Sequence, residues 1–274
     1  MEHIKKIISE TFNGEEKNGQ FESFSKLDDN INNTVTFRDS PTGIWGNSTT
    51  GNASTKVRNT YHPLKTPHIP NEAASLESLY APYGRVFNNL PKIITQRLIL
   101  RPANIKDAND IYEYSKDEKV AEHVLWSAHK SLGETKQYLK QMIKLYKNGS
   151  PSSFVIVLKS TGRVIGTIGF MSINPEHSSA EVGYSMARDM WGKGIMTEAL
   201  KALIGFGFQT LRLNRIDAMH DCNNPSSGRV MQKCGMKFEG CLRQKVYNKG
   251  KFVDVNLYSI LWEDYKKEIE GELL

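Results

Sequence analysis

The residues best suited to chemistry lie in the stretch 180–199, which reads AEVGYSMARDMWGKGIMTEA. A strand pattern comes first, with Val182, Tyr184 and Met186 alternating to one face. The turn Gly192-Lys193-Gly194 follows, and a helix then begins with Ile195, Met196 and Thr197. Glycines let backbone N–H groups approach an anion, the helix start adds the positive end of its dipole, and Lys193 adds a charge. The stretch fits a bound phosphate, although a glycine turn can also simply reverse the chain.

A second group of polar residues follows the next predicted strand. His220 ends the strand RIDAMH, and Asn224-Pro225-Ser226-Ser227 precedes the next helix. Histidine titrates near neutral pH and can act as an acid or a base, but a lone histidine is more often a structural residue. Asn224 and Ser227 are also favoured helix caps, so a functional role and a capping role both remain open.

Glu181 is the carboxylate closest to these groups. On an alternating strand it shares a face with the small residues Gly183 and Ser185, which leave room for a substrate beside it. Its carboxylate could then accept a proton, or it could be an ordinary solvated or salt-bridged residue. A β-bulge would shift this alternation.

The elements that position these groups follow from hydrophobic periodicity. From Thr95 onward the order is predicted to be β-α-α-β-β-β-α-β-α-β-β, with no internal repeat. Turns at Ser160-Thr161-Gly162 and Asn248-Lys249-Gly250 each join two antiparallel strands. Strands are expected at 97–102, 153–159, 163–173, 180–186, 215–220, 236–246 and 252–262, and helices at 107–115, 131–146, 196–208 and 226–234.

Residues 1–94 differ from the rest of the chain. The segment 13–60 is rich in Asn, Ser, Thr and Gly, and prolines follow at 63, 67, 70, 82 and 91. Such a composition favours turns and extended segments and buries little apolar surface. We expect a partly ordered accessory region at 1–94, whose role the sequence does not indicate, and a folded domain at 95–274.

Composition limits the function classes. Of the 274 residues, 39% are hydrophobic and 24% charged, as in globular proteins. No apolar run reaches membrane-spanning length, and the start MEHIKKIISE lacks the apolar core of a secretory signal, so we expect a cytoplasmic protein without membrane partners. Cys222, Cys234 and Cys241 are odd in number and lack CxxC spacing, which predicts reduced thiols and no metal site.

The net charge of +6 lies entirely in the second region. Residues 1–94 hold 10 basic and 10 acidic side chains, whereas residues 95–274 hold 26 and 20. A basic domain suits an anionic ligand such as a nucleotide cofactor, but surface lysines that confer solubility would give the same count. No nucleic-acid motif or arginine cluster is present, so nucleic acid is not expected as the main ligand.

Four blocks in register resemble the Gcn5-related N-acetyltransferase (GNAT) superfamily, and within it the branch that acetylates ribosomal-protein N-termini. The blocks are TQRLILRP, AEVGYSM with WGKGIMTEAL, NPSSGRVMQKCGMKFEG, and KFVDVNLYSIL, which together span about residues 95–265. The resemblance implies an α+β or α/β fold. Its central sheet would be mixed and mostly antiparallel, splayed between the fourth and fifth strands and flanked by helices.

The resemblance also implies that acetyl-CoA is the acyl donor. Met186 would pair through its backbone with the pantetheine arm, and Gly192, Lys193, Gly194, Ile195, Met196 and Thr197 would cradle the diphosphate. Asn224 would bind the pantetheine, and Ser227 would lie near the sulfur. The superfamily often has Gln or Arg where this chain has Asp189, beside Arg188, so one expected contact is missing and Asp189 should point away.

The implied reaction is attack of a neutral amine on the thioester, which needs a proton acceptor, donors for the oxyanion and an acid for the thiolate. Ser227 is the candidate acid, and a backbone N–H near Met186 the oxyanion donor. Ribosomal members of this branch can carry a Glu where Val246 stands, so that role does not transfer. Glu181 is the local alternative base and His220 a second one, with Asp254 and Tyr247 as further candidate substrate contacts.

The expected partner is a primary amine, either a protein N-terminal α-amine or a small molecule, and a homodimer is compatible with the sequence. Two other classes compete with this interpretation. The chain could be a non-catalytic CoA-binding module that engages a protein through residues 1–94. It could also be a nucleotide-phosphate enzyme, but GxxxxGK[ST] and an acidic metal cluster are absent from the sequence.

Overall fold

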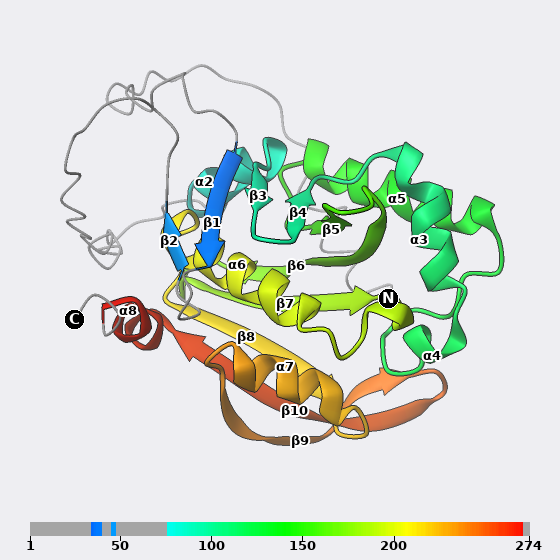
Figure 1. The fold of residues 1–274 in the computed structure, drawn as a ribbon. Coiled ribbons are helices and arrows are strands. Elements are labelled where there is room, and N and C mark those ends of the chain that lie inside the picture. The colour runs from blue at the N-terminus through cyan, green and yellow to red at the C-terminus, as the bar shows by residue number, and fades with distance from the viewer. Residues whose placement is uncertain (1–33, 40–44, 48–75, 271–274) are drawn as a thin grey trace. The chain divides into compact units, whose positions relative to one another are not determined.

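The computed structural model describes the backbone of residues 34–39, 45–47 and 76–270 (Figure 1). The strands are β1 (Thr34–Asp39), β2 (Trp45–Asn47), β3 (Lys92–Ile94), β4 (Leu98–Arg101), β5 (Ser153–Leu158), β6 (Val164–Asn174), β7 (Ser179–Met186), β8 (Arg215–Asp221), β9 (Lys237–Asn248) and β10 (Lys251–Leu261). The helices are α2 (Leu76–Asn88), α3 (Ala108–Ser115), α4 (Glu118–Ala121), α5 (Leu132–Lys147), α6 (Ile195–Gln209), α7 (Pro225–Lys233) and α8 (Trp262–Glu270). Two 3-10 turns, η1 (Ile105–Asp107) and η2 (Arg188–Met190), complete the order.

One sheet connects all the described strands, in the order β2-β1-β3-β4-β5-β6-β7-β8-β10-β9. The pairs β1–β3 and β7–β8 are parallel and the other neighbours are antiparallel. From β4 to β10 the elements follow the predicted order, with each major helix and strand within a few residues of its expected bounds. The expected mixed, mostly antiparallel sheet is therefore confirmed.

The fourth and fifth predicted strands, β7 and β8, separate part of the way along their length. They pair only from Ser179↔Arg215 to Val182↔Ala218, although β7 continues to Met186 and β8 to Asp221. Beyond Val182 one edge of β7 therefore lacks its neighbouring strand. This is the splay that the family resemblance implied.

Helices cover the two faces of the sheet near the splay. On one face, Tyr184 of β7 contacts Ser227 of α7, which runs beside β8, β9 and β10 (Figure 1). On the other face, Tyr114 of α3 contacts Thr167 and Ser185. Since Tyr184 and Ser185 are successive residues of one strand, they point to opposite faces. Glu181, Gly183 and Ser185 therefore look toward the α3 side, whereas Val182, Tyr184 and Met186 look toward α7.

Residues 76–94, which the sequence analysis assigned to the accessory region, pack into this domain. The Phe87 side chain of α2 is fully buried, and its ring lies 6.3 Å from that of Phe170 in an edge-to-face contact. Ile93 of β3 is also fully buried and pairs with Leu100 of β4. The stretch is ordered although Pro82 lies inside α2, and Pro91 lies between α2 and β3. The expected accessory residues 1–33, 40–44 and 48–75 lie outside the described residues.

A substitution in α2 tests whether this helix belongs to the folded unit. Phe87→Ala should lower the free energy of unfolding by about 3–5 kcal/mol, because it removes a buried aromatic ring and leaves a cavity. Tyr80→Ala on the same helix is the control, since Tyr80 is 46% exposed, and should change stability by less than ~0.5 kcal/mol. Urea denaturation of the full chain gives both values. Equal effects of the two substitutions would mean that α2 does not belong to the core.

Candidate active site

The glycine turn between η2 and α6 has the backbone geometry that an anion site requires. Gly192 and Gly194 adopt φ of 74° and 70°, a left-handed conformation that side chains other than glycine rarely tolerate. Gly194 is the N-cap of α6, and residues 191–194 are exposed whereas Ile195 and Met196 are buried. The N–H groups of Ile195, Met196 and Thr197 form the first turn of α6 and have no intrahelical partner. The predicted diphosphate-binding residues, Gly192 to Thr197, thus form this turn and the first turn of α6.

The charged residues just before the turn are engaged elsewhere. The Asp189 carboxylate is 2.8 Å from the Arg163 guanidinium, and the Arg188 guanidinium is 2.8 Å from Asp117. Because Asp189 is paired with a cation, its repulsion toward an anion at the turn is reduced. Lys193 remains the cation inside the turn itself.

The backbone of β7 offers hydrogen-bonding groups at the splay. Ala187 N–H donates to Ile165 at 2.8 Å, and Gly166 pairs with Met186. In an antiparallel pair this pattern turns the N–H and C=O of Met186 and of Tyr184 away from β6, toward the side that β8 has left. The indole N–H of Trp191 donates to the Met186 carbonyl at 2.9 Å. The Met186 N–H is therefore directed at the splay, while its carbonyl already holds one partner.

The start of α7 forms the opposite wall of the splay. The Asn224 side chain accepts a hydrogen bond from Ser227 N–H at 3.4 Å, so Asn224 does act as a helix cap. The hydroxyls of Ser227 and Tyr184 are 2.9 Å apart. Burial raises the pKa of Tyr184, and its hydrogen bond to Ser227 offsets part of this rise. Tyr184 therefore stays protonated and joins the Ser227 hydroxyl to the unpaired end of β7.

His220 lies against the first turns of α7. It is buried, and its Nδ1 is 2.8 Å from the Asp221 carbonyl, which requires Nδ1 to carry the proton. Nε2 is buried without a hydrogen-bond partner among the described residues. A Cβ on Gly228 would lie 2.7 Å from this nitrogen, so only glycine fits there without moving the ring. His220 thus lies behind the turn that carries Ser227, with Nε2 buried against Gly228.

Glu181 lies on the α3 side of β7, beside Asp217 of β8 in the parallel register. The bulge between Phe170 and Ser172 lies in β6, so the alternation of β7 is preserved as predicted. Burial raises the pKa of Glu181, the neighbouring Asp217 raises it further, and Lys245 partly offsets both. A partly buried carboxylate with a raised pKa is a suitable proton acceptor.

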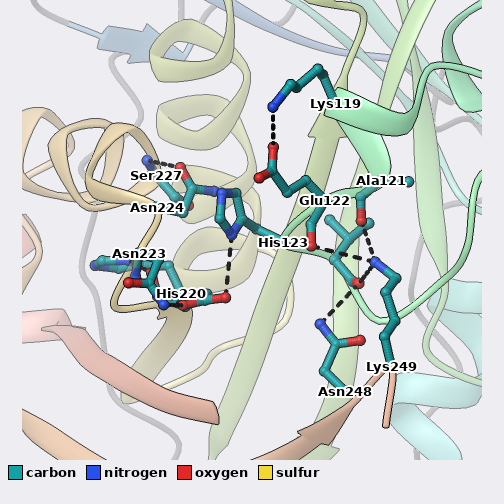
Figure 2. A network of polar contacts seen from close by, with 12 residues as sticks. Lys119, Ala121, Glu122, His123, His220, Asn223, Asn224, Ser227, Asn248 and Lys249 are labelled. Atoms are coloured by element: carbon teal, nitrogen blue, oxygen red, sulfur yellow. Dashed lines mark hydrogen bonds and ion pairs between the residues drawn. The ribbon is translucent and has the colours of Figure 1, made fainter. Parts of the chain in front are cut away.

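The segment after α4 contributes residues that the sequence analysis did not single out (Figure 2). His123 Nδ1 is 3.2 Å from the Asp221 carboxylate at the open end of β8. Burial acts to raise the pKa of Asp221. Hydrogen bonds from Asn223 N–H and from His123 outweigh this effect, so the pKa lies below its usual range. The Lys249 ammonium, at the tip of the β9–β10 hairpin, donates to the Ala121 and Val124 carbonyls at 2.5 and 3.0 Å. These contacts tie the hairpin tip to the loop that carries His123.

The remaining candidates lie farther along the β9–β10 hairpin. Tyr247 is 63% exposed and stacks edge-to-face on Phe252. Asp254 accepts from Gln244 N–H at 2.7 Å and lines a hollow with Cys241 and Lys245. All three cysteines carry free thiols, and Cys222 and Cys241 lie with their sulfurs 3.7 Å apart. The structure does not bring Tyr247 or Asp254 into hydrogen-bonding contact with Glu181, Ser227 or His220 among the described residues.

The described part of the chain contains neither a metal-binding cluster nor a membrane-spanning helix. It holds no group of three His, Cys, Asp or Glu side chains that could bind a metal ion. None of its helices combines the length and the apolar character needed to cross a membrane.

Comparison with known protein families identifies the family of this chain. The acetyltransferase (GNAT) domain family matches residues 97–237 of the 274. The chain belongs to the GNAT acetyltransferase family. The expected resemblance and the enzyme class, an N-acetyltransferase, are therefore confirmed.

Relatives of this GNAT domain include proteins with a named substrate. An uncharacterized N-acetyltransferase p20 from Bacillus licheniformis is 34% identical over 173 residues, which cover 63% of this chain and 97% of that protein. The ribosomal-protein-serine acetyltransferase of Escherichia coli K12 is 32% identical over 126 residues, or 46% of this chain and 69% of that one. The structure of RimL, a ribosomal L7/L12 α-N-protein acetyltransferase in complex with coenzyme A, covers 61% of this chain and 94% of its own, with a TM-score of 0.55. At 24% identity this last match shows the shared fold.

The GNAT fold thus gathers Ser227, Asn224, His220 and the β7 edge at one end of the splay, with Glu181 on the face opposite α7. Tyr184, Trp191 and His123 are neighbours that sequence reasoning missed. Tyr184 could have been found, because its alternation with Val182 and Met186 puts it on the α7 face. His123 gave no such signal, since its contact with Asp221 joins residues 98 positions apart.

The raised pKa of Glu181 leads to a stability prediction. A carboxyl group with a raised pKa binds its proton more tightly in the folded state, so its ionisation opposes folding as the pH rises from the unfolded value of ~4.3 through the raised value. Glu181→Gln should therefore be more stable than the wild type at pH 7, and this advantage should vanish near pH 3.5, where both states are protonated. Urea denaturation at the two pH values checks this.

The exposed Glu176 provides the matched control, because Glu176→Gln should leave the stability difference between the two pH values unchanged. A Glu181→Gln protein that is equally or less stable at pH 7 would contradict the prediction.

Proposed function

We propose that this GNAT domain transfers an acetyl group from acetyl-CoA to a primary amine, either a protein N-terminal α-amine or a small-molecule amine. The observation that carries the proposal is the unpaired edge of β7 at Tyr184 and Met186, which leads to the exposed glycine turn at the start of α6. An elongated donor with amide groups at one end and a diphosphate at the other matches these two features. The likeness to RimL, whose structure contains coenzyme A, supports the same choice of donor.

The donor would lie along β7 with its diphosphate over the turn. The N–H groups of the first turn of α6 and the Lys193 ammonium would hold the diphosphate. The Met186 N–H would donate a hydrogen bond to the pantetheine arm of acetyl-CoA, or to the thioester oxygen that becomes negative as the amine attacks. Asn224 caps α7 with its side-chain oxygen and has its NH₂ group left for the donor.

The amine would approach from the face that carries Glu181. Its nitrogen forms a bond to the acetyl carbon, the C–S bond breaks, and the proton lost by nitrogen passes to the Glu181 carboxylate. The departing thiolate receives a hydrogen bond from Ser227, whose hydroxyl is held by Tyr184 at 2.9 Å. A thiol has a pKa near ~8.5, so the thiolate needs no strong acid. The Nε2 of His220 is buried against Gly228, so His220 would support the start of α7 rather than contact the donor or the amine.

The proposed role of Ser227 predicts a loss of turnover. Ser227→Ala should lower kcat about 100-fold, as expected when a proton donor is removed, while CoA binding measured by calorimetry changes little. Release of free thiol from acetyl-CoA in the presence of an amine measures kcat. Ser226→Ala is the matched control, since Ser226 is exposed and contacts Arg229.

Two results would overturn parts of this assignment. Equal activity of the Ser227→Ala and Ser226→Ala proteins would remove Ser227 from the chemistry. Binding of CoA without thiol release on any amine would instead favour a non-catalytic CoA-binding module that uses its N-terminal region to engage a partner.

The acceptor choice gives a further prediction. At pH 7 about one in seven α-amines is neutral, against roughly one in 2,500 lysine amines, because their pKa values are near ~7.8 and ~10.4. A serine-initiated peptide with a free N-terminus should therefore react on the order of 10²-fold faster than the same peptide with a blocked N-terminus and one lysine. Serine is chosen because the Escherichia coli relative is named a ribosomal-protein-serine acetyltransferase. Mass spectrometry locates the added acetyl group, and preferential lysine acetylation would contradict the prediction.

A further inference from the structure

A buried carboxylate lies directly behind the candidate diphosphate site. Glu198 is in the first turn of α6, and its side chain is only 4% exposed. A carboxylate at this place would weaken the attraction of the helix start for an anion if it stood alone. It is instead surrounded by three donors. Thr95 Oγ1 lies at 2.5 Å, Arg97 N–H at 2.8 Å and Arg97 Nε at 2.6 Å.

Arg97 also reaches the glycine turn. Its Nη1 donates to the Lys193 carbonyl at 3.0 Å, and its Nη2 lies 3.7 Å from the position that a Cβ on Gly194 would take. The guanidinium therefore lies between the buried carboxylate and the backbone of the turn. One face of the turn is occupied by Arg97, and the opposite face is left for a ligand.

The contact with the Lys193 carbonyl fixes the direction of the next amide. In a trans peptide the C=O of Lys193 and the N–H of Gly194 point in opposite directions. Because Arg97 holds the carbonyl, the Gly194 N–H points away from Arg97, toward the exposed side of the turn. Without this contact, the glycines on both sides of Lys193 would leave the peptide plane freer to rotate.

We propose that Arg97, anchored by Glu198 and Thr95, is a positioning residue that presents the amides of the glycine turn to the diphosphate of acetyl-CoA. The proposal rests on the donor assignment made above. Arg97 offsets the charge of Glu198 and orients the Lys193–Gly194 peptide, and it contacts neither the thioester nor the amine. Its side chain is 43% exposed, whereas that of Glu198 is 4% exposed.

A donor that lacks the diphosphate separates this role from a purely structural one. Arg97→Ala in the full chain should raise the KM for acetyl-CoA about 10- to 100-fold and leave kcat and the KM for the amine within twofold. With S-acetylpantetheine, which carries the same thioester and arm but no diphosphate, kcat/KM should be the same in the variant and the wild type. Arg97→Lys keeps the charge but loses the forked geometry. Its KM for acetyl-CoA should lie between those of the wild type and Arg97→Ala.

Lys201→Ala supplies the matched control, because Lys201 lies one turn farther along α6 and pairs with Glu268 at 3.4 Å. It should leave the KM for acetyl-CoA unchanged. Glu198→Gln, which keeps the shape but removes the charge, tests the anchor from the other side and should raise the same KM. Circular dichroism verifies that each variant is folded.

Each other outcome overturns the inference. An equal loss with both donors would mean that Arg97 only holds the fold together, and an unchanged KM for acetyl-CoA would mean that the turn does not need it. A wild-type protein that acetylates no amine with either donor would instead contradict the proposed function. The two failures are therefore distinguishable.

Discussion

The separation of β7 from β8 is the constraint on which the rest of the site depends. A β-strand inside a sheet uses both rows of backbone groups, so it has none left for a ligand. Here β7 keeps β6 along its full length and loses β8 after Val182. The groups of Tyr184 and Met186 are thereby released at the point where the chain turns into Gly192 and α6. The same separation brings the start of α7 opposite the unpaired edge.

The polar side chains near this edge are held in place by hydrogen bonds within the fold. Asn224 caps α7 with its oxygen, His220 donates through Nδ1 to a backbone carbonyl, and Tyr184 holds Ser227. Polar groups that are buried with partners cost little to keep in place, and their geometry is fixed before a ligand arrives. Preorganisation of this kind is what acyl transfer requires, because the oxyanion and the thiolate exist only briefly.

The sequence predicted the features that depend on local pattern and missed those that depend on contacts between distant residues. Alternation placed Glu181 and Gly183 on one face of β7, and the two glycines with Lys193 identified the turn. The pairs Arg97–Glu198 and His123–Asp221 join residues about a hundred positions apart, and each member looks like an ordinary surface charge in its own segment. Helix α2 and the three-residue strand β3 were missed for a related reason, since their order comes from burial against Phe170 and pairing with β4 rather than from their own composition.

The position of β10 between β8 and β9 has a consequence for how much of the chain is needed as a unit. Residues 97–237, the range matched by the family, stop before β10 and almost all of β9. A fragment cut to that range would leave β8 paired to β7 at four positions and open along its other side. Open strand edges of this kind recruit other chains and lead to aggregation. The smallest piece that keeps every described strand paired therefore extends past the matched range in both directions.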